Sequence, residues 1–138
     1  MADIRFDSGV QSFDVNGVVS VEFSPTDSDF AQKLYDVFEK IDEKQKAYTE
    51  KLQAEQATRE VFQIARQFDT EIRNLIDSVF DKPVCDALFR TNVMALADGL
   101  PVWCNFLLAI IEKMEVGFEA EKLKTNPRIA KYTKKWKK

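Results

Sequence analysis

The feature that most constrains the fold is a stretch, residues 26–82, that contains neither glycine nor proline. It is rich in Ala, Glu, Gln, Lys, Leu and Arg, which are the strongest helix formers. One unbroken helix of this length would extend about 85 Å at 1.5 Å per residue. A compact domain of 138 residues has a radius of gyration of only about 14 Å. The stretch must therefore either fold back on itself as a helical hairpin or project from a small body as one long helix.

Two apolar stripes at helical spacing divide this stretch, and their phases differ by roughly 145° at 100° per residue. The change of phase falls at residues 53–58, after a charged and polar segment in which Tyr48 and Leu52 continue the first stripe. A break there would produce a helical hairpin. One continuous helix that shows different faces to different partners, or to a second copy of the chain, also fits the pattern. A coiled coil is the weaker alternative, because no heptad continues across the change of phase. The stripes are Phe30, Leu34, Val37, Phe38 and Ile41, followed by Val61, Phe62, Ala65, Phe68, Ile72, Leu75, Ile76 and Val79.

Residues 10–23 are expected to form an antiparallel β-hairpin. Asn16 and Gly17 are a strong turn signal, because both residues tolerate positive φ. A three-residue loop that ends at Gly17 would pair Phe13 with Val19 and align the apolar faces, so we prefer it to a two-residue loop. An isolated hairpin is marginally stable, so this one should pack on a helix or on another chain. Two more alternating residues could add a third, short strand: Ile4 and Phe6.

Cap and break residues predict where the helices begin and end. Thr26 or Ser28 can cap the first helix. Asp81 is expected to cap a later helix that has Pro83 in its first turn, and Gly99 to end that helix in the left-handed conformation. The final helix follows directly and is apolar nearly all round, which predicts that it is the central buried helix.

These elements predict a mainly α fold with a small N-terminal antiparallel β-hairpin (α+β), in which a helical bundle contains one long helix or a helical hairpin. We expect a single domain, residues 1–138. Its parts are the hairpin region 4–23, the helical body 26–124 and the C-terminal tail 125–138.

The tail is basic and amphipathic. Residues 128–138 hold six basic residues and no acidic one, and subtracting these six charges from the net charge of −3 leaves −9 for the rest of the chain. Such a segment can dock on its own body, bind a partner protein, or bind nucleic acid or anionic lipid. The residues that we expect to contact a partner lie in the tail and in the exposed middle of the long helical stretch: Arg128, Lys131, Tyr132, Lys135, Trp136, Tyr48 and Leu52.

The composition argues against an enzyme. Histidine, the commonest general base and metal ligand, is absent, and four glycines are too few for a phosphate-binding loop. Cys85 and Cys104 lack CxxC spacing and are interpreted as buried thiols. The longest apolar run, residues 102–111, is too short to span a bilayer. We therefore expect no catalytic residue, no metal, no cofactor and no membrane partner, and a soluble intracellular protein.

Three stretches of the sequence resemble small proteins from the structural gene cluster of long-tailed bacteriophages and prophages of Gram-positive bacteria. They are Phe23-Ser24-Pro25-Thr26-Asp27 after the hairpin, Ala97-Asp98-Gly99-Leu100-Pro101-Val102-Trp103, and Asn126-Pro127-Arg128-Ile129-Ala130-Lys131-Tyr132. The family that the chain resembles is the tail assembly chaperones.

The resemblance implies a helper protein without catalytic residues in the cytoplasm of the host bacterium. It would bind the tape-measure protein and recruit tail-tube subunits, and it could form a homo-oligomer. Two alternatives stay open. One is a nucleic-acid-binding module that acts through the basic tail, and the other is a structural protein of the phage head–tail region.

Overall fold

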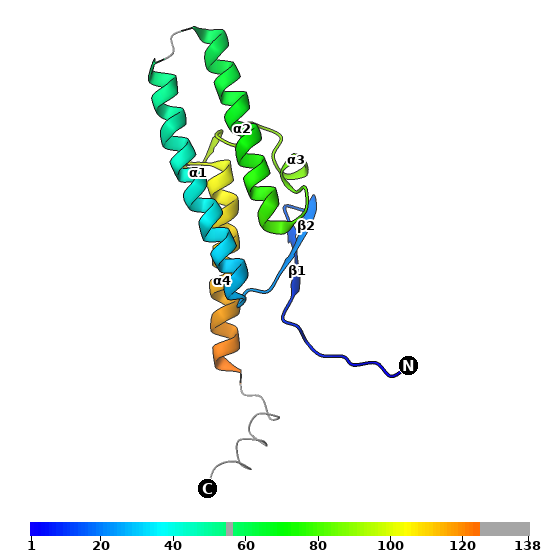
Figure 1. Ribbon diagram of the computed structural model, residues 1–138. Helices are drawn as coiled ribbons and strands as arrows, with labels where there is room; N and C mark the ends of the chain where they lie inside the picture. The colour runs from blue at the N-terminus through cyan, green and yellow to red at the C-terminus, as the bar shows by residue number, and fades with distance from the viewer. Residues whose placement is uncertain (55–56, 125–138) are drawn as a thin grey trace.

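The computed structural model describes residues 1–54 and 57–124 (Figure 1). Its fold is mainly helical with a small N-terminal antiparallel sheet, which confirms the predicted fold class. The elements, in chain order, are β1 (Gln11–Val15), β2 (Val19–Phe23), α1 (Ser28–Ala54), α2 (Thr58–Phe80), α3 (Cys85–Leu88), β3 (Leu96–Ala97), β4 (Leu100–Pro101) and α4 (Val102–Leu123).

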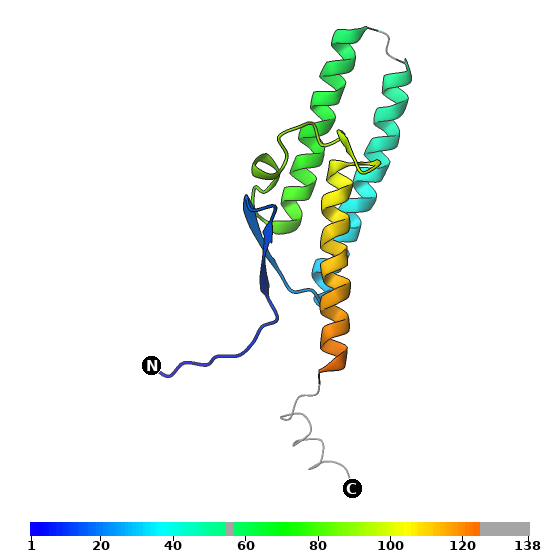
Figure 2. The ribbon, with the colours of Figure 1, turned by 180° about the vertical axis from the view of Figure 1, so that it is seen from behind.

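Helices α1 and α2 form an antiparallel hairpin, in which they lie side by side in both views (Figures 1 and 2). Helix α1 ends at Ala54 and α2 begins at Thr58, within the predicted change of phase. Of the two alternatives, the break is therefore correct. Both stripes face the same core, because the separation of the two helices lets α2 rotate about its own axis independently of the phase of α1. The residues that the two helices bury are Phe30, Leu34, Val37, Ile41, Phe68, Ile72, Ile76 and Val79.

Helix α4 lies along α1 (Figure 2). The ring of Trp103 meets that of Phe38 edge-on, with 5.4 Å between the centroids. The prediction that α4 is the central buried helix is wrong, because only part of its apolar surface is buried. One face is buried, whereas Leu108 and Val116 on other faces are exposed. The reason is that the described elements that pack on α4 lie on one side of it. The buried residues of α4 are Trp103, Phe106, Leu107, Ile110 and Met114.

The N-terminal hairpin has the predicted loop length but a different register. Phe13 lies opposite Val21, and Val15 opposite Val19, so the loop is residues 16–18. The predicted pairing of Phe13 with Val19 is therefore wrong. Asn16 and Gly17 both take positive φ, at 53° and 71°, and the Val18 amide donates to the Val15 carbonyl at 3.1 Å. The turn thus closes around Asn16-Gly17, and Val18 becomes the extra loop residue.

A chain of aromatic rings joins the hairpin to the helices, which confirms that the hairpin packs on helices. Phe23 of β2 stacks on Phe13 of β1, with 4.5 Å between the ring centroids, and on Phe30 of α1 at 4.6 Å. Phe30 contacts Phe80, which in turn contacts Phe106 of α4. The predicted third strand is absent from the described residues. Two side chains that it would have used are exposed: Ile4 and Phe6.

The cap residues differ from the predicted ones. The carboxylate of Asp27 accepts from the Asp29 amide at 2.9 Å and caps α1, so Thr26 and Ser28 do not. Asp81 has φ 50° and ends α2 in the left-handed conformation, so it does not begin the next helix. That role belongs to Asp77, whose Oδ1 accepts from two backbone amides at 2.9 and 3.0 Å. The two donors are Val84 and Cys85.

The segment after α2 is mostly irregular, whereas the sequence predicted a helix up to Gly99. Helix α3 has only four residues. Asp98 and Gly99, with φ of 54° and 79°, form the turn between the short strands β3 and β4. Gly99 is therefore left-handed as predicted, but in a hairpin turn and not at a helix end.

Arg73 of α2 holds this segment in place. Its guanidinium lies 2.8 Å from Asp69 Oδ2 and 3.2 Å from Asp86 Oδ1. Asp69 Oδ1 accepts from the Val93 amide at 2.7 Å, so the pair fixes the segment at a second point. The same guanidinium donates to three backbone carbonyls, those of Cys85, Phe89 and Thr91.

Candidate functional site

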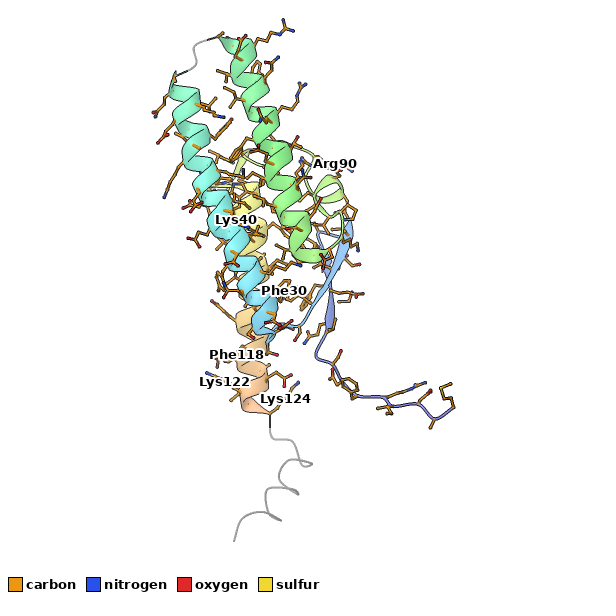
Figure 3. All side chains as sticks on the ribbon, in the orientation of Figure 1. Phe30, Lys40, Arg90, Phe118, Lys122 and Lys124 are labelled. Carbon is orange, nitrogen blue, oxygen red and sulfur yellow. The ribbon has the colours of Figure 1, made fainter. Side chains whose placement is uncertain are left out.

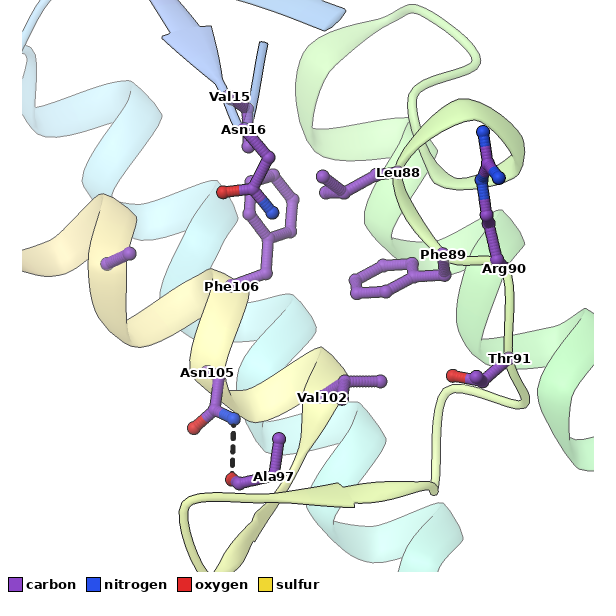
Figure 4. A pocket seen from close by; sticks show the side chains of 11 residues that line it. Val15, Asn16, Leu88, Phe89, Arg90, Thr91, Ala97, Val102, Asn105 and Phe106 are labelled. Carbon is purple, nitrogen blue, oxygen red and sulfur yellow. Dashed lines mark hydrogen bonds between the residues drawn. The ribbon is translucent and has the colours of Figure 1, made fainter. Parts of the chain in front are cut away.

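One pocket, of about 370 Å³, lies between the β1–β2 turn, the segment after α3 and helix α4 (Figure 4). The side chains of Leu88, Phe89 and Phe106 point towards its centre. The side chain of Arg90, the only charged residue among the described residues that line the pocket, points away. Asn105 Nδ2 donates to the Ala97 carbonyl at 2.8 Å, so this amide is already engaged. No pair of titratable side chains converges among the described residues that line this pocket, and it offers little for chemistry or for charged ligands.

A second hollow, of about 550 Å³, lies between the N-terminal part of α1 and the C-terminal half of α4. We call it the α1–α4 groove. Figure 3 shows one of its residues, Phe118, on the last turns of α4, close to the point where the chain leaves that helix. The lining residues are Pro25, Thr26, Asp27, Ser28, Ala31, Tyr35, Ile111, Met114, Glu115, Phe118 and Glu119.

A close approach of the backbone closes one end of the groove. Pro25, which is buried, packs directly on Gly117 of α4. A Cβ atom on residue 117 would overlap the Cβ of Pro25 and lie 2.9 Å from its Cγ. Because glycine has no Cβ, the residues that lead into α1 can lie against α4 here. The groove begins immediately beside this contact.

The floor of the groove is apolar and its rim is acidic. Tyr35 is 51% exposed and Phe118 is 49% exposed, although both are large rings that gain free energy from burial. Asp27, Glu115 and Glu119 provide three carboxylates, and no basic residue is among the described lining residues.

A lysine at the edge of the groove offsets part of the negative charge of these carboxylates. Lys122 Nζ lies 3.5 Å from Glu119 Oε1 and 5.2 Å from the centre of the Phe118 ring. Among the described residues, no ion pair forms at Asp27 or at Glu115. The arrangement favours a ligand that is apolar on one side and basic at its edges, which is the character of many amphipathic helices that bind in grooves.

The predicted contact residues of the middle segment lie elsewhere. The ring of Tyr48 stacks on that of Phe68, with 4.5 Å between the centroids, and both Tyr48 and Leu52 are half-buried. Burial raises the pKa of the Tyr48 hydroxyl. Tyr48 therefore contributes to the contact between α1 and α2, next to the ion pair of Lys44 and Glu71 at 3.5 Å. The five predicted contact residues of the tail, Arg128, Lys131, Tyr132, Lys135 and Trp136, lie outside the described residues.

The α1–α4 groove was not predicted from the sequence. A signal for it existed: Tyr35 lies off the first apolar stripe, and Phe118 follows the most apolar part of the last helix. Neither residue revealed that the two would line one groove, because that depends on how α4 lies along α1.

In the comparison with protein families, residues 16–138 match the model of DUF6673, described as a family of unknown function. The chain belongs to this family. The part that matches DUF6673 includes all of the α1–α4 groove and the basic tail, and it leaves out β1 and the residues before it. No match was found among curated proteins or among solved structures.

Two further findings concern other kinds of site. None of the helices in residues 1–54 and 57–124 combines the length and the apolar character needed to cross a membrane. Within the same ranges, no group of three or more Cys, Asp or Glu side chains is placed to hold a metal ion. The Cys85 thiol donates to the Arg73 carbonyl at 3.6 Å, and burial is the main cause that raises the pKa of both Cys85 and Cys104. Both thiols are thus kept protonated and weakly nucleophilic at neutral pH.

Proposed function

We propose that this protein is a non-enzymatic tail assembly chaperone of a phage or prophage, which works in the cytoplasm of the host bacterium. It binds an apolar helical segment of the tape-measure protein in the α1–α4 groove and brings tail-tube subunits to it. The observation that carries the proposal is the groove itself, with its apolar floor, half-exposed rings and acidic rim.

The dimensions of the groove suit a helix. Its α4 side runs from Ile111 to Glu119, which corresponds to about 12 Å, or roughly two helical turns. A third helix placed over α1 and α4 would cover Tyr35 and Phe118, the two half-exposed rings that line the described part of the groove. A site of this size binds weakly on its own. Many copies bound along one long helical partner would coat it and would still release it during assembly.

The resemblance to tail assembly chaperones gives separate support. Pro25, Thr26 and Asp27 belong to one of the three stretches that carry the resemblance, and all three line the groove. The Asp27 carboxylate also caps α1, so the groove and the start of this helix depend on the same short segment.

The test is an affinity pull-down from the native host under phage-producing conditions, with nuclease present. The wild-type protein is compared with Phe118→Ser, and with Phe62→Ser as the matched control, because Phe62 is 65% exposed on α2 and does not line the groove. We expect wild type and Phe62→Ser to recover the tape-measure and tail-tube proteins. Loss of one buried aromatic contact should reduce recovery by Phe118→Ser roughly tenfold.

Equal recovery by the two variants would contradict the groove as the binding site. Recovery of nucleic acid alone, lost on nuclease treatment, would contradict the chaperone and favour a nucleic-acid-binding module. Co-purification with finished virions would favour the structural head–tail alternative.

A further inference from the structure

We infer that residues 128–138 of the same chain occupy the α1–α4 groove when no partner is bound, so that a partner helix must displace them. This inference rests on the proposed function only in assigning the partner to the same groove. The basic tail would then compete with the partner helix for the groove and keep the apolar floor covered until assembly begins.

The position of the groove suits this segment. Helix α4 ends at Leu123, and the groove includes Phe118 and Glu119, little more than one turn before that end. Asn126-Pro127 is a helix break that can also begin a new helix, so the chain can reverse direction within a few residues. Eleven residues in a helix extend about 16 Å, which is enough to run back along the roughly 12 Å that the groove occupies on α4.

The chemistry of the segment complements that of the groove. Ile129, Tyr132 and Trp136 have spacings of three and four residues, so they share one face of a helix and match the apolar floor. The six basic residues of the segment meet the carboxylates of Asp27, Glu115 and Glu119 at the rim. No basic residue among the described lining residues opposes them.

The occupant is the chain's own segment and not that of a second copy, because the connection is short. A short covalent connection produces an effective concentration on the order of millimolar. A second copy at micromolar concentration cannot compete with it.

The experiment uses tryptophan fluorescence of the full chain without any partner. The chain has two tryptophans, and Trp103 is 2% exposed in the core. Quenching by acrylamide therefore reports on Trp136, and Trp136→Phe serves as the blank. A synthetic peptide of residues 125–138 provides the value for fully exposed Trp136. We expect Trp136 in the wild-type chain to be quenched several-fold less than in the peptide.

Two groove variants and one control complete the design. Glu115→Lys replaces an attractive charge at the rim by a repulsive one, and should weaken docking roughly fivefold, so that quenching of Trp136 rises towards the peptide value. Phe118→Ser should have the same effect through the apolar floor. Glu50→Lys is the control, because Glu50 is exposed on α1 about 33 Å from the start of that helix and should leave quenching unchanged. Far-ultraviolet circular dichroism verifies that each variant is folded.

Three results would overturn the inference. They are wild-type quenching equal to that of the peptide, equal effects of Glu115→Lys and Glu50→Lys, and protection of Trp136 that disappears on dilution together with a dimer mass in light scattering. The last result would mean that a second copy fills the groove. If Trp136 is not protected, the pull-down can still show a difference between Phe118→Ser and Phe62→Ser, so the proposed function would stand. If the two variants recover partners equally, Trp136 can still be protected, so the inference about the tail would stand.

Discussion

At the scale of single residues, Gly117 shows how one missing methyl group shapes the molecule. Glycine inside a helix costs about 1 kcal/mol relative to alanine, so α4 would be more stable by itself with alanine at this position. The position nevertheless requires glycine, because Pro25 packs on the backbone where a Cβ would lie. This contact sets the distance between the start of α1 and α4, and hence the width of one end of the groove.

The substitution Gly117→Ala is therefore expected to destabilise the protein by about 1–2 kcal/mol, because the overlap with Pro25 costs more than the helix gains. Thermal unfolding followed by circular dichroism measures the effect. The control is the same substitution in a Pro25→Gly background, where the overlap is removed and alanine should stabilise the protein. If Gly117→Ala has the same sign in both backgrounds, the contact does not limit this position.

Cys85 provides a second prediction at this scale. Burial, followed by a hydrogen bond with Asp77, raises the pKa of the Cys85 thiol above its ordinary value. The folded protein therefore keeps a proton that the unfolded chain loses above about pH 8.5. The stability that this thiol contributes is fully present below that pH and is lost as the pH rises further.

We expect the free energy of unfolding in urea to fall by about 1–2 kcal/mol between pH 8 and pH 10 through Cys85. Cys85→Ala should remove this part of the pH dependence. Cys104→Ala is the matched control and should remove less, because Cys104 is only half-buried. An unchanged pH profile in Cys85→Ala would mean that other groups cause the dependence.

At the scale of elements, the segment between α2 and α4 depends on side chains of α2 and not on its own propensity. The sequence predicted a helix here, because Val84, Leu88 and Leu96 are apolar and no glycine or proline interrupts residues 84–98. In the structure, carboxylates of α2 bind the backbone amides of Val84, Cys85 and Val93. These bonds join residues 7, 8 and 24 positions apart, so they stabilise a shape that the three- and four-residue spacing of a helical pattern does not encode.

Arg73 is the centre of this arrangement, and Arg73→Met tests it. The side chains of Arg73 and Asp69 are each 17% exposed, so removing the guanidinium leaves a mostly buried carboxylate and three carbonyls without their partner. We expect a loss of about 2–4 kcal/mol in urea unfolding and faster amide hydrogen exchange in residues 84–95.

The control for Arg73 is Asp86→Ala. Asp86 also pairs with Arg73, but its side chain is 89% exposed, and such surface pairs contribute less than about 1 kcal/mol. A similar loss of stability in Asp86→Ala and Arg73→Met would show that the exposed pair holds the segment, contrary to this account.

At the scale of the whole molecule, charge and apolar surface are unevenly distributed. Six basic residues are concentrated in the tail, and the rest of the chain carries −9 when they are subtracted from the net charge of −3. Leu108, Val116 and Phe118 leave apolar surface exposed on α4. A protein that binds helices needs such a surface and must also keep it from associating with other copies.

Truncation after Asn126 is therefore expected to increase self-association and the binding of hydrophobic dyes. Every buried apolar residue of the described chain lies between Val21 and Met114, so the truncated protein retains its core. Light scattering and dye fluorescence at matched concentrations measure the change. Truncation combined with Phe118→Ser should reverse part of it, and no change on truncation would contradict a covering role for the tail.

The sequence by itself determined the features that depend on neighbouring residues. The helices follow from residue propensity and apolar periodicity. The separation of α1, which ends at Ala54, from α2, which begins at Thr58, follows from the change of phase, and the turn at Asn16-Gly17 follows from tolerance of positive φ. Each of these signals acts over a few residues, so a pattern in the sequence carries it.

Only the tertiary structure decided the features that depend on distant residues. The register of the hairpin, the irregular segment held by Arg73 and Asp69, and the exposed face of α4 all differ from the prediction. The α1–α4 groove depends on Pro25 meeting Gly117, residues that lie 92 positions apart. Such contacts become favourable only after the chain has folded, because their free energy depends on packing and on exclusion of water, and not on local backbone preference.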